Sequence, residues 1–474
     1  MLFNSFSYAF LFLPLAAIVY GIARDYVGQR SAQIWLLLSS LFFYGFAKPS
    51  NLLLLTASIL FNWAVGRLLA SQTDSSPYRK AIFWAGLTVD IAFLFSFKYI
   101  NLVLSGVAAL HGPKFLLPDL EFPLGISFFT LTQIMYLVDT YQAPETANSL
   151  FDHAAFVSFF PYVTSGPISR SMEIVPQFKE RAESETRLEM ACRGLYLFSL
   201  GLTKKVVFAD SFARVADAGF RSAYGYSTLE SWVFCLAYTF QIYFDFSGYS
   251  DMAMASALML GIEIPQNFNA PFRSLSISEY WQRWHMSLSA FITHYLYTPI
   301  LRSMRGRATV RKSALATIFA MTVAGIWHGP SWTFAVYGLV HGLALAANQI
   351  WKRRKKRMPV WLSWVLTFGF VNLTFVLFRS PDLSTALRFY SYMLPHSNLF
   401  GIESLRGAIP FTPVTMVRPI VIGVVIAFFF KTSTELSRRM PLVSSRALAT
   451  AALLLLSAFF MNSTAAKTFI YFAF

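Results

Sequence analysis

Charge is scarce in this 474-residue chain: only 13% of its residues are Asp, Glu, Lys or Arg, and 56% are hydrophobic. An average globular chain carries roughly 25% charged residues, so a water-soluble fold of this size is excluded. Apolar runs of about 20 residues, each long enough to cross a hydrocarbon core, recur from end to end. The sequence therefore predicts an all-α, polytopic integral membrane protein without a sizeable soluble domain.

Motifs of several enzyme classes are also absent. The two cysteines, Cys192 and Cys235, are too few and too far apart in sequence for a disulfide framework, and we expect both to be small buried residues. Neither an HExxH nor a CxxC pattern occurs, and there is no GxSxG elbow and no P-loop. We therefore expect no metal site, and a serine hydrolase or an ATP-driven pump has no support.

Acidic residues are fewer than basic ones, 23 against 39, which gives a formal net charge of +16. The basic residues cluster in short loops between apolar runs, chiefly Arg302–Lys312 and Trp351–Arg357, as the positive-inside rule predicts. Most of the charge thus reflects membrane topology, although part of it could face an anionic donor such as coenzyme A, or lipid headgroups. We expect membrane lipids as partners and no nucleic acid.

Spans are predicted where apolar runs are closed by charges or helix breakers. Lys98 interrupts the run 81–110, so we expect a span followed by an interfacial segment. Residues 156–170 contain two prolines and a glycine and are too broken to span, which favours a re-entrant segment. The polar stretch 170–193 is predicted to be a cytoplasmic helix or loop, and 383–392 an amphipathic helix. The other predicted spans are 6–23, 32–47, 51–65, 194–208, 232–246, 361–378, 420–430 and 448–460.

Two tryptophan–histidine pairs, Trp284-His285 and Trp327-His328, distinguish the stretch Asp245–His341 from the rest of the chain. Each pair places a titratable imidazole in an otherwise apolar neighbourhood. An ionisable residue inside a membrane is costly to keep, and it is therefore a functional candidate by default. We expect the chemistry of this protein at these two histidines.

His328 is followed directly by Gly329-Pro330, a dipeptide that cannot continue a regular helix. The basic clusters on either side of 313–350 should both be cytoplasmic, so this apolar stretch must enter the membrane and return. We expect the turn at Gly329-Pro330, with His328 at its tip and at membrane depth. There a neutral imidazole could act as a general base for a hydroxyl; the alternative is a buried histidine that is hydrogen-bonded to a neighbour.

His285 is predicted to lie on a helix that begins at the capping box Ser276–Glu279. On that helix Trp284 and Leu288 would share an apolar face beside His285. His285 could pair with His328, orient a substrate or merely fill the core.

Charged residues near these spans have two interpretations. Asp245 and Asp251 lie at or near the end of an apolar run, where they could be functional or could pair with Arg273 or Arg283. The adjacent Lys204–Lys205 could reach the membrane interface with their long stems.

The remaining histidines are weaker candidates. His341 is interpreted as a packing residue or as a support for another side chain. His294 could line a path, but a structural role is favoured. His111, His153 and His396 are expected in loops or at interfaces, and no role is assigned to them.

With these residues the sequence resembles the membrane-bound O-acyltransferase (MBOAT) superfamily, in particular the bacterial branch typified by alginate O-acetyltransferase. The resemblance covers most of the chain, and the paired WH and WHG elements are its most specific part. The matching stretches are PLGISFFTLTQIMYLVDTYQ, SGPISR, YFDFSGYSDMAMASALMLGIEIPQNFNAPFRSLSISEYWQRWHMSLSAF, AGIWHGPSWTFAVYGLVHG and the FIYFAF tail.

The resemblance implies an architecture: a ring of roughly ten or more transmembrane helices, with re-entrant or broken helices around a central tunnel. The protein would be a multi-pass protein of the bacterial inner membrane with a single domain, 1–474. Within that domain we expect N-terminal spans, a re-entrant segment with a cytoplasmic helix, a catalytic core and C-terminal spans. These parts are 1–150, 151–193, 194–350 and 351–474.

The resemblance also implies an activity. An acyl group, most simply acetyl, would pass from a cytoplasmic thioester (acetyl-CoA or an acyl carrier) to an exported polysaccharide, with a separate periplasmic or surface acyltransferase completing the transfer. His328 would be the general base, and His285 would position a group or stabilise the oxyanion. The further candidates for substrate binding or for lining the tunnel are Trp327, Trp284, Asp245, Asp251, Arg283 and Asn267.

One departure from the branch bears on the acceptor. The branch typically has Arg-Asp-Tyr-x-Tyr after the first WH element, whereas this chain has Thr293-His294-Tyr295-Leu296-Tyr297. Cellulose, peptidoglycan or another exported glycan is therefore as open as alginate. Two alternatives are D-alanyl transfer from a carrier protein to teichoic acid and a transporter or flippase without chemistry.

Overall fold

The computed structural model describes residues 1–474 except 47, 74, 101, 105–122, 181–183, 223–224, 308, 356–357, 403–412, 440–443, 464–467 and 471–474. Helices make up most of the described chain, and no strand occurs in it. Because the described helices include several that are long and apolar enough to cross a membrane, the predicted all-α membrane fold is confirmed. These candidate spans are Ser7–Val27, Ser50–Ser71, Pro77–Lys98, Val360–Arg379 and Ser445–Asn462.

The chain folds as two compact units. The first consists of Met1–Phe198, Met252–Pro265 and Pro441–Leu448, and the second contains Ser199–Asp251, Gln266–Met440 and Ala449–Phe474. The boundaries fall inside helices, so α9 (Ser184–Thr203), α11 (Thr228–Met259) and α22 (Ser444–Ser463) contribute residues to both units.

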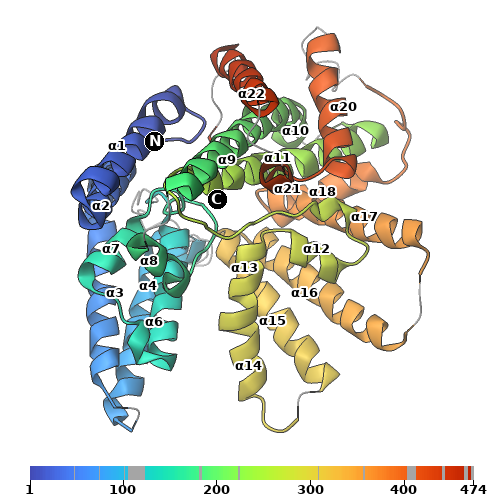
Figure 1. Ribbon diagram of the computed structural model, residues 1–474. Helices are drawn as coiled ribbons and strands as arrows, with labels where there is room; N and C mark the ends of the chain where they lie inside the picture. Colours follow the sequence, from blue (N-terminus) through green and yellow to red (C-terminus); the bar gives the residue numbers. More distant parts are fainter. Residues whose placement is uncertain are drawn as a thin grey trace. The chain divides into compact units, whose positions relative to one another are not determined.

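Most of the first unit, residues 1–198, is drawn in blue to green in Figure 1. Its centre is aromatic: the Tyr8 ring stacks on Phe3 with centroids 4.6 Å apart, and its hydroxyl lies 2.8 Å from that of Ser256. Its elements are η1 (Ser7–Phe12), α1 (Leu13–Ile22), η2 (Ala23–Val27), α2 (Gln29–Gly45), α3 (Ser50–Ser71), α4 (Pro77–Lys98), α6 (Ile126–Gln142), η3 (Pro144–Thr146), α7 (Leu150–Ser158) and α8 (Ser171–Lys179).

Two buried carboxylates of the first unit have polar partners on other segments. Asn62 of α3 donates to Asp90 of α4 at 2.9 Å, and Arg170 donates two hydrogen bonds to the buried carboxylate of Asp139 in α6. The helix α4 ends at Lys98, as predicted. Pairing of this kind is what allows charged side chains to persist in an apolar interior.

Residues 159–170 form no helix, although nearly all of them are buried. Their irregular backbone follows from Pro161, Gly166 and Pro167, and it lies inside protein rather than in contact with lipid. The prediction that the stretch 156–170 is too broken to form a spanning helix agrees with this backbone.

The second unit holds both tryptophan–histidine pairs. Its helices are drawn in green through yellow to red in Figure 1. Its elements are η4 (Lys204–Ala209), α10 (Asp210–Ser222), η5 (Pro271–Arg273), α12 (Ile277–Arg283), α13 (Met286–Phe291), η6 (Ile292–Tyr297), α14 (Thr298–Ser303), α15 (Val310–His328), α16 (Trp332–Arg353), α17 (Val360–Arg379), α18 (Leu383–Met393), α20 (Pro413–Phe429) and α21 (Ser433–Arg439).

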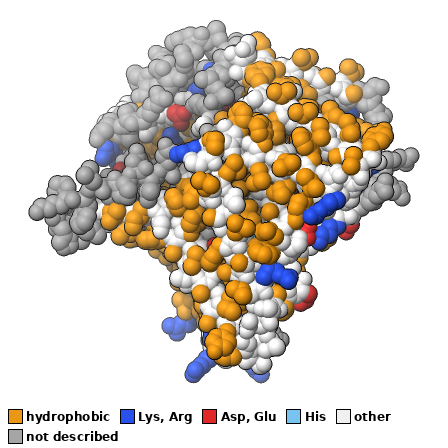
Figure 2. Space-filling model, turned by 90° about the vertical axis from the view of Figure 1, so that its left-hand side faces the viewer, with side chains coloured by type: hydrophobic (Ala, Val, Ile, Leu, Met, Phe, Trp, Pro, Cys, Tyr) orange, Lys and Arg blue, Asp and Glu red, His pale blue; other side chains and the backbone are white. Residues whose placement is uncertain are grey.

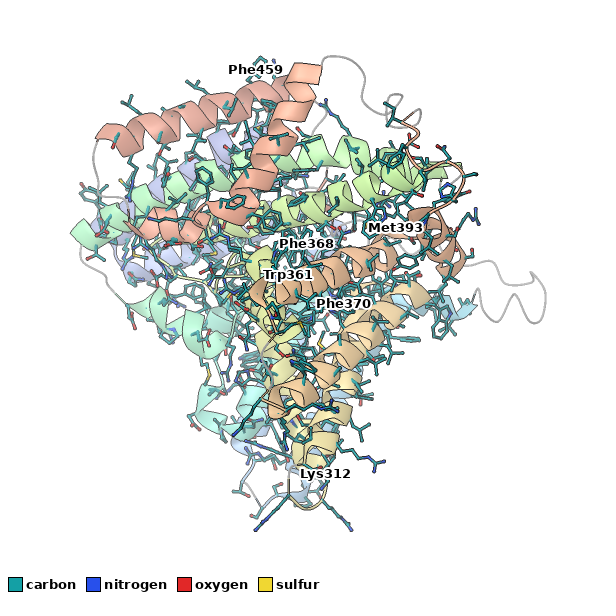
Figure 3. The ribbon with its side chains drawn as sticks, turned by 90° about the vertical axis from the view of Figure 1, so that its right-hand side faces the viewer. Lys312, Trp361, Phe368, Phe370, Met393 and Phe459 are labelled. Atoms are coloured by element: carbon teal, nitrogen blue, oxygen red, sulfur yellow. The ribbon has the colours of Figure 1, made fainter. Side chains whose placement is uncertain are left out.

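The two helices α15 and α16 form the predicted hairpin, side by side in Figure 1. The turn falls at Gly329–Ser331, as expected from the Gly-Pro breaker. Glycines allow the helices to approach closely: a Cβ atom on Gly338 would overlap the Met321 carbonyl oxygen and the Cα of Gly325. Figure 3 labels Lys312 at the loop end of α15 and Trp361 and Phe368 on the neighbouring α17.

Several predicted boundaries are wrong. The helix α9 begins at Ser184, so the polar stretch before residue 194 is partly continuous with the next apolar helix. The helix α11 contains 32 residues, about 48 Å at 1.5 Å per residue, and extends well beyond the predicted span 232–246. Its later turns stay helical because they are buried inside protein rather than exposed to solvent.

The surface agrees with a membrane environment. In Figure 2, hydrophobic side chains cover much of the described surface of the face in view, and Lys and Arg appear only in scattered places. A broad apolar surface with few charges is typical of a protein that contacts lipid chains.

Candidate active site

The backbone at His285 is unusual. His285 has φ 43° and ψ 55°, in the left-handed region that β-carbon-bearing residues rarely adopt. This conformation ends α12 at Arg283 and starts α13 at Met286. Ser276 caps α12 as predicted: its hydroxyl accepts from the Glu279 amide at 3.2 Å, and the Glu279 carboxylate accepts from the Leu275 amide at 2.8 Å.

The prediction that a single helix carries Trp284, His285 and Leu288 is wrong. The reason lies in a loop that precedes α12 in sequence. The carbonyl of Asn267 accepts from the Met286 amide at 3.0 Å. The side-chain oxygen of Asn267 accepts from the Ser287 hydroxyl at 2.6 Å and from the Ser287 amide at 3.2 Å. These hydrogen bonds to Asn267 bend the chain at His285.

His285 is fully buried, with 0% of its surface exposed. Its Nδ1 atom lies 3.4 Å from the Asn267 oxygen, and its ring meets Phe246 edge-on with centroids 4.7 Å apart. Among the described residues, its Nε2 atom has no hydrogen-bond partner. Since His285 lies between two short helices, outside every candidate span, burial in protein lowers its pKa and favours the neutral imidazole.

The hydrogen-bond pattern indicates the tautomer of His285. The Asn267 oxygen already accepts from Ser287, so it can only accept from His285 as well. This pattern favours the tautomer with the imidazole proton on Nδ1 and the lone pair on Nε2. A buried lone pair of this kind can accept a hydrogen bond or a proton from a ligand.

His328 is the last residue of α15 and lies next to the hairpin turn, as predicted. It is 6% exposed, and its ring packs on Phe378 of α17 with centroids 5.2 Å apart. Between ring centroids, Trp327 lies 5.1 Å from His328 and Tyr337 of α16 lies 6.4 Å from it. The tip of the hairpin thus presents an imidazole inside an aromatic enclosure.

His341 is a packing residue with both ring nitrogens engaged. The Trp281 indole donates to its Nδ1 at 3.2 Å, so Nε2 carries the proton, and Nε2 lies 3.0 Å from the Thr374 hydroxyl. Tyr337 packs against it with centroids 4.4 Å apart, as does Phe370 of α17, labelled in Figure 3, at 5.1 Å.

Aromatic rings link the two tryptophan–histidine pairs. Phe375 of α17 contacts Trp284 at 5.4 Å and Tyr337 at 6.5 Å, measured between ring centroids. Among the described residues, no hydrogen bond joins His285 to His328. The two histidines therefore belong to one aromatic region of the second unit, but they do not form the hydrogen-bonded pair that the sequence left open.

Asp245 and Asp251 lie within α11, not near the end of a helix. The Lys205 ammonium is 2.8 Å from Asp245 and 3.1 Å from Asp210, and the Lys204 ammonium is 2.7 Å from Asp251. The expectation that these lysines reach the membrane interface is wrong, because these ion pairs hold them inside the protein.

The predicted partners of the two aspartates are wrong as well. Arg283 pairs with Glu279, four residues earlier on α12, at 2.8 Å. Arg273 donates to the carbonyl oxygen of Phe430. Local pairing of Arg283 prevails because residues four apart on a helix face each other.

A cavity of about 510 Å³ opens beside the site, between α12, α13, η6 and the α15–α16 hairpin. Trp281, which donates to His341, forms part of its wall, and so does Met286, the residue after His285. Its polar wall is ordered: the Gln349 amide donates to the Thr317 hydroxyl at 2.9 Å. The cavity lining is Ser278, Trp281, Gln282, Met286, Ser289, Ala290, Ile292, Thr293, His294, Tyr297, Thr317, Ala320, Met321, Leu345 and Gln349.

The remaining histidines divide between the two units. His294 lines this cavity and is exposed, with its Nδ1 atom 2.9 Å from the Ala290 carbonyl oxygen. The prediction for His153 is wrong: it is a fully buried residue of α7 whose ring packs on Tyr136. His396 lies in a loop, as expected, and His111 lies outside the described residues.

Sequence reasoning missed the roles of Lys205 and Phe246. The ion pairing of Lys205 could have been predicted, because two adjacent lysines in an apolar run need nearby carboxylates. Asp245 and Asp251 follow in the next long helix. Nothing local indicated that Phe246 touches His285. Among the described residues, no group of three or more His, Cys, Asp or Glu side chains could hold a metal ion.

Comparison with known proteins adds independent information. The model of the family described as "MBOAT, membrane-bound O-acyltransferase family" matches residues 39–380. The peptidoglycan O-acetyltransferase of Helicobacter pylori is 39% identical over 418 residues, covering 82% of this chain and 79% of that protein. The probable alginate O-acetylase of Pseudomonas aeruginosa is 34% identical over 420 residues, covering 85% and 78%. The teichoic acid D-alanyltransferase of Streptococcus thermophilus is 32% identical over 241 residues, 49% of this chain and 58% of that protein.

Proposed function

Because the chain belongs to the membrane-bound O-acyltransferase family, we propose that it moves an acetyl group from a cytoplasmic thioester across the membrane for O-acetylation of an exported glycan. The chain is an O-acyltransferase and a multi-pass membrane protein, and its bacterial relatives place it in the inner membrane. The observation that carries the finer proposal is a buried, neutral imidazole with an open Nε2 lone pair at His285, in one aromatic region with His328.

The reaction is an exchange of a thioester for an oxygen ester. The acceptor oxygen forms a new bond to the acyl carbon while a base takes the hydroxyl proton. The carbon–sulfur bond then breaks, and the thiolate leaves and takes up that proton to become the thiol. No net proton is produced, so the step suits a site that excludes water.

His328 is proposed as the general base. Its position at a helix break places the imidazole at the tip of a hairpin rather than inside a regular helix packing surface. A neutral imidazole there matches the acid–base strength that a hydroxyl acceptor needs near neutral pH.

His285 is proposed to position the acceptor. With its proton on Nδ1, its Nε2 atom can accept a hydrogen bond from the acceptor hydroxyl. Stabilisation of an oxyanion would need the proton on Nε2 instead, so this tautomer favours positioning over the oxyanion role.

The cavity of about 510 Å³ is proposed to hold the arm of the thioester donor. Its lining mixes apolar side chains with hydroxyl and amide groups, which suits an arm that carries both methylene and amide units. It lies on the α15–α16 hairpin. Basic residues near the start of α15 and at the end of α16, such as Lys312 and Arg353, could bind the donor phosphates. Acetyl-CoA or an acyl carrier protein would satisfy this chemistry.

The acceptor is proposed to be peptidoglycan or an alginate-type polysaccharide, the polymers named for the two relatives that match across most of the chain. A separate periplasmic or surface acyltransferase would complete the transfer. D-alanylation of teichoic acid is the alternative, because a partial relative carries that name.

The test is the ester content of the exported glycan in cells that carry wild type or His328→Ala at equal membrane levels. Mild alkali releases ester-bound acetate and D-alanine, which are quantified separately for each polymer. We expect His328→Ala to reduce released acetate by at least about 100-fold, the range found for lost general-base catalysis. Unchanged acetate would refute the catalytic role, and release of D-alanine in place of acetate would support the alternative.

A further inference from the structure

A cluster of three buried charges lies beside the site without touching either histidine. The Lys205 ammonium in η4 bridges Asp245 of α11 and Asp210 of α10 at 2.8 and 3.1 Å. All three side chains are less than one-tenth exposed. Burying charges in this way gives little net stability compared with apolar residues of similar volume, so the cluster calls for another explanation.

The cluster holds a segment that is remote in sequence. The second carboxylate oxygen of Asp245 accepts a hydrogen bond from the backbone amide of Ile470 at 2.7 Å, across 225 positions. The Lys205 ammonium donates to the carbonyl oxygen of Thr468 at 3.5 Å. Asp245 as acceptor and Lys205 as donor thus bind the backbone of 468–470, so the position of this segment does not depend on side-chain packing alone.

The held segment packs toward His285. Phe469 is buried and stacks on Tyr249, with centroids 4.2 Å apart and ring planes 16° apart. It also contacts Phe246 at 5.5 Å, and Phe246 is the ring that meets the His285 imidazole at 4.7 Å. Contacts therefore run without a gap from the charge cluster through Phe469 and Phe246 to His285.

We propose that Lys205 and Asp245 are positioning residues that clamp the segment 468–470 behind Phe246 and so hold the His285 imidazole in its working orientation. The inference rests on the proposed acyl transfer. The clamp matters because His285 occupies a left-handed backbone conformation and because, among the described residues, its ring makes one long hydrogen bond, 3.4 Å from Nδ1 to Asn267. Without Phe246 behind it, the ring could rotate away from the acceptor.

The experiment is a double-mutant cycle of Asp245→Ala and Phe469→Ala, read as the initial rate of glycan O-acetylation in intact cells per molecule in the membrane. If both residues act through the clamp, each change lowers the rate about ten- to a hundred-fold, because a small misplacement of a reacting group has effects of this size. The double variant should then be no slower than the slower single variant.

Two further variants separate positioning from stability. Asp245→Asn keeps an oxygen that can accept from the Ile470 amide, so it should recover a large part of the rate lost in Asp245→Ala. Asp139→Ala removes a buried aspartate whose ion pair with Arg170 involves no residue of 468–470. It should lower the thermal unfolding midpoint in detergent yet leave the rate per folded molecule close to wild type.

The outcomes are distinct. Two results would contradict the clamp but leave the acyltransfer proposal intact. The first is that the two rate losses multiply in the double variant. The second is that Asp245→Ala acetylates at the wild-type rate while His328→Ala is inactive. Full acetylation by His328→Ala would instead refute the proposed roles on which the inference rests. A loss of rate in Asp139→Ala that matches Asp245→Ala would show that stability alone explains the effect.

Discussion

At the scale of single residues, the site depends on Asn267, whose effect on the backbone at His285 was not predicted from the sequence. Asn267 accepts hydrogen bonds with both its carbonyl and its side-chain oxygen, and through them it imposes the break between α12 and α13. The left-handed conformation of His285 is stored strain of the kind that persists where surrounding contacts over-determine it. The backbone conformation of His285 is therefore imposed by neighbouring residues and is not the one that histidine intrinsically favours.

Replacing Asn267 with Ala tests this dependence. The change leaves the buried Ser287 amide and hydroxyl without the oxygen they now share, and a lost partner of this kind costs about 1–3 kcal/mol. We expect a lower thermal unfolding midpoint in detergent and a lower acetylation rate at matched protein level. Asn267→Asp, which keeps the accepting oxygens, should retain more of both; equal losses in the two variants would contradict the assigned role.

At the scale of elements, the α15–α16 hairpin carries His328 because its two helices can approach closely. A glycine at 338 is required by the contact with Met321 and Gly325, where no β-carbon fits. The two arms are mainly apolar, and polar contacts between them lie near their open end, where Gln349 of α16 bonds Thr317 and Ser313 of α15. Close packing of small residues is the main force that joins helices within a membrane.

We predict that Gly338→Ala separates the helices and lowers both stability, by about 1–3 kcal/mol as for other overpacked cores, and acetylation. The matched control is Gly369→Ala on α17, where a β-carbon meets nothing within 4 Å. This control should be neutral or slightly stabilising, because alanine favours helix more than glycine does. The measurements are the thermal unfolding midpoint and the amount of ester released for both variants. Equal values for Gly338→Ala and Gly369→Ala would argue against close helix packing as the cause.

At the scale of the whole molecule, a binding space arises where elements far apart in sequence meet. The large cavity takes residues from α12, α13, η6, α15 and α16, and no single element would reveal it. Ala290 lines it and is itself exposed, so a larger side chain there can fill the cavity without disturbing the core.

Ala290→Phe should therefore impair donor use without unfolding the protein. In membrane vesicles supplied with acetyl-CoA, we expect a higher apparent KM for acetyl-CoA, by roughly tenfold for a contact worth about 1.4 kcal/mol, with a smaller change in maximal rate. Ala290→Ser, which adds little volume, is the control. An unchanged KM in Ala290→Phe would place the donor elsewhere.

Much of the architecture follows from the sequence by itself. Low charge and recurring apolar runs dictate a helical membrane protein, and Gly329-Pro330 between two basic clusters dictates the hairpin with His328 beside its turn. The capping box at Ser276 likewise marks the start of α12. These features are local, because hydrophobicity, charge and backbone restrictions act within a few residues of the position that they determine.

Only the tertiary structure decided which residues meet. The sequence suggested arginine partners for Asp245, yet it pairs with Lys205 from an earlier helix and binds the amide of Ile470, 225 positions later. The tautomer of His285 and the break beside it depend on Asn267, 18 positions away, and the predicted continuous helix failed for that reason. Inside an apolar interior, a charged or polar group is satisfied by whichever partner the fold brings within about 3 Å, and no local pattern records that choice.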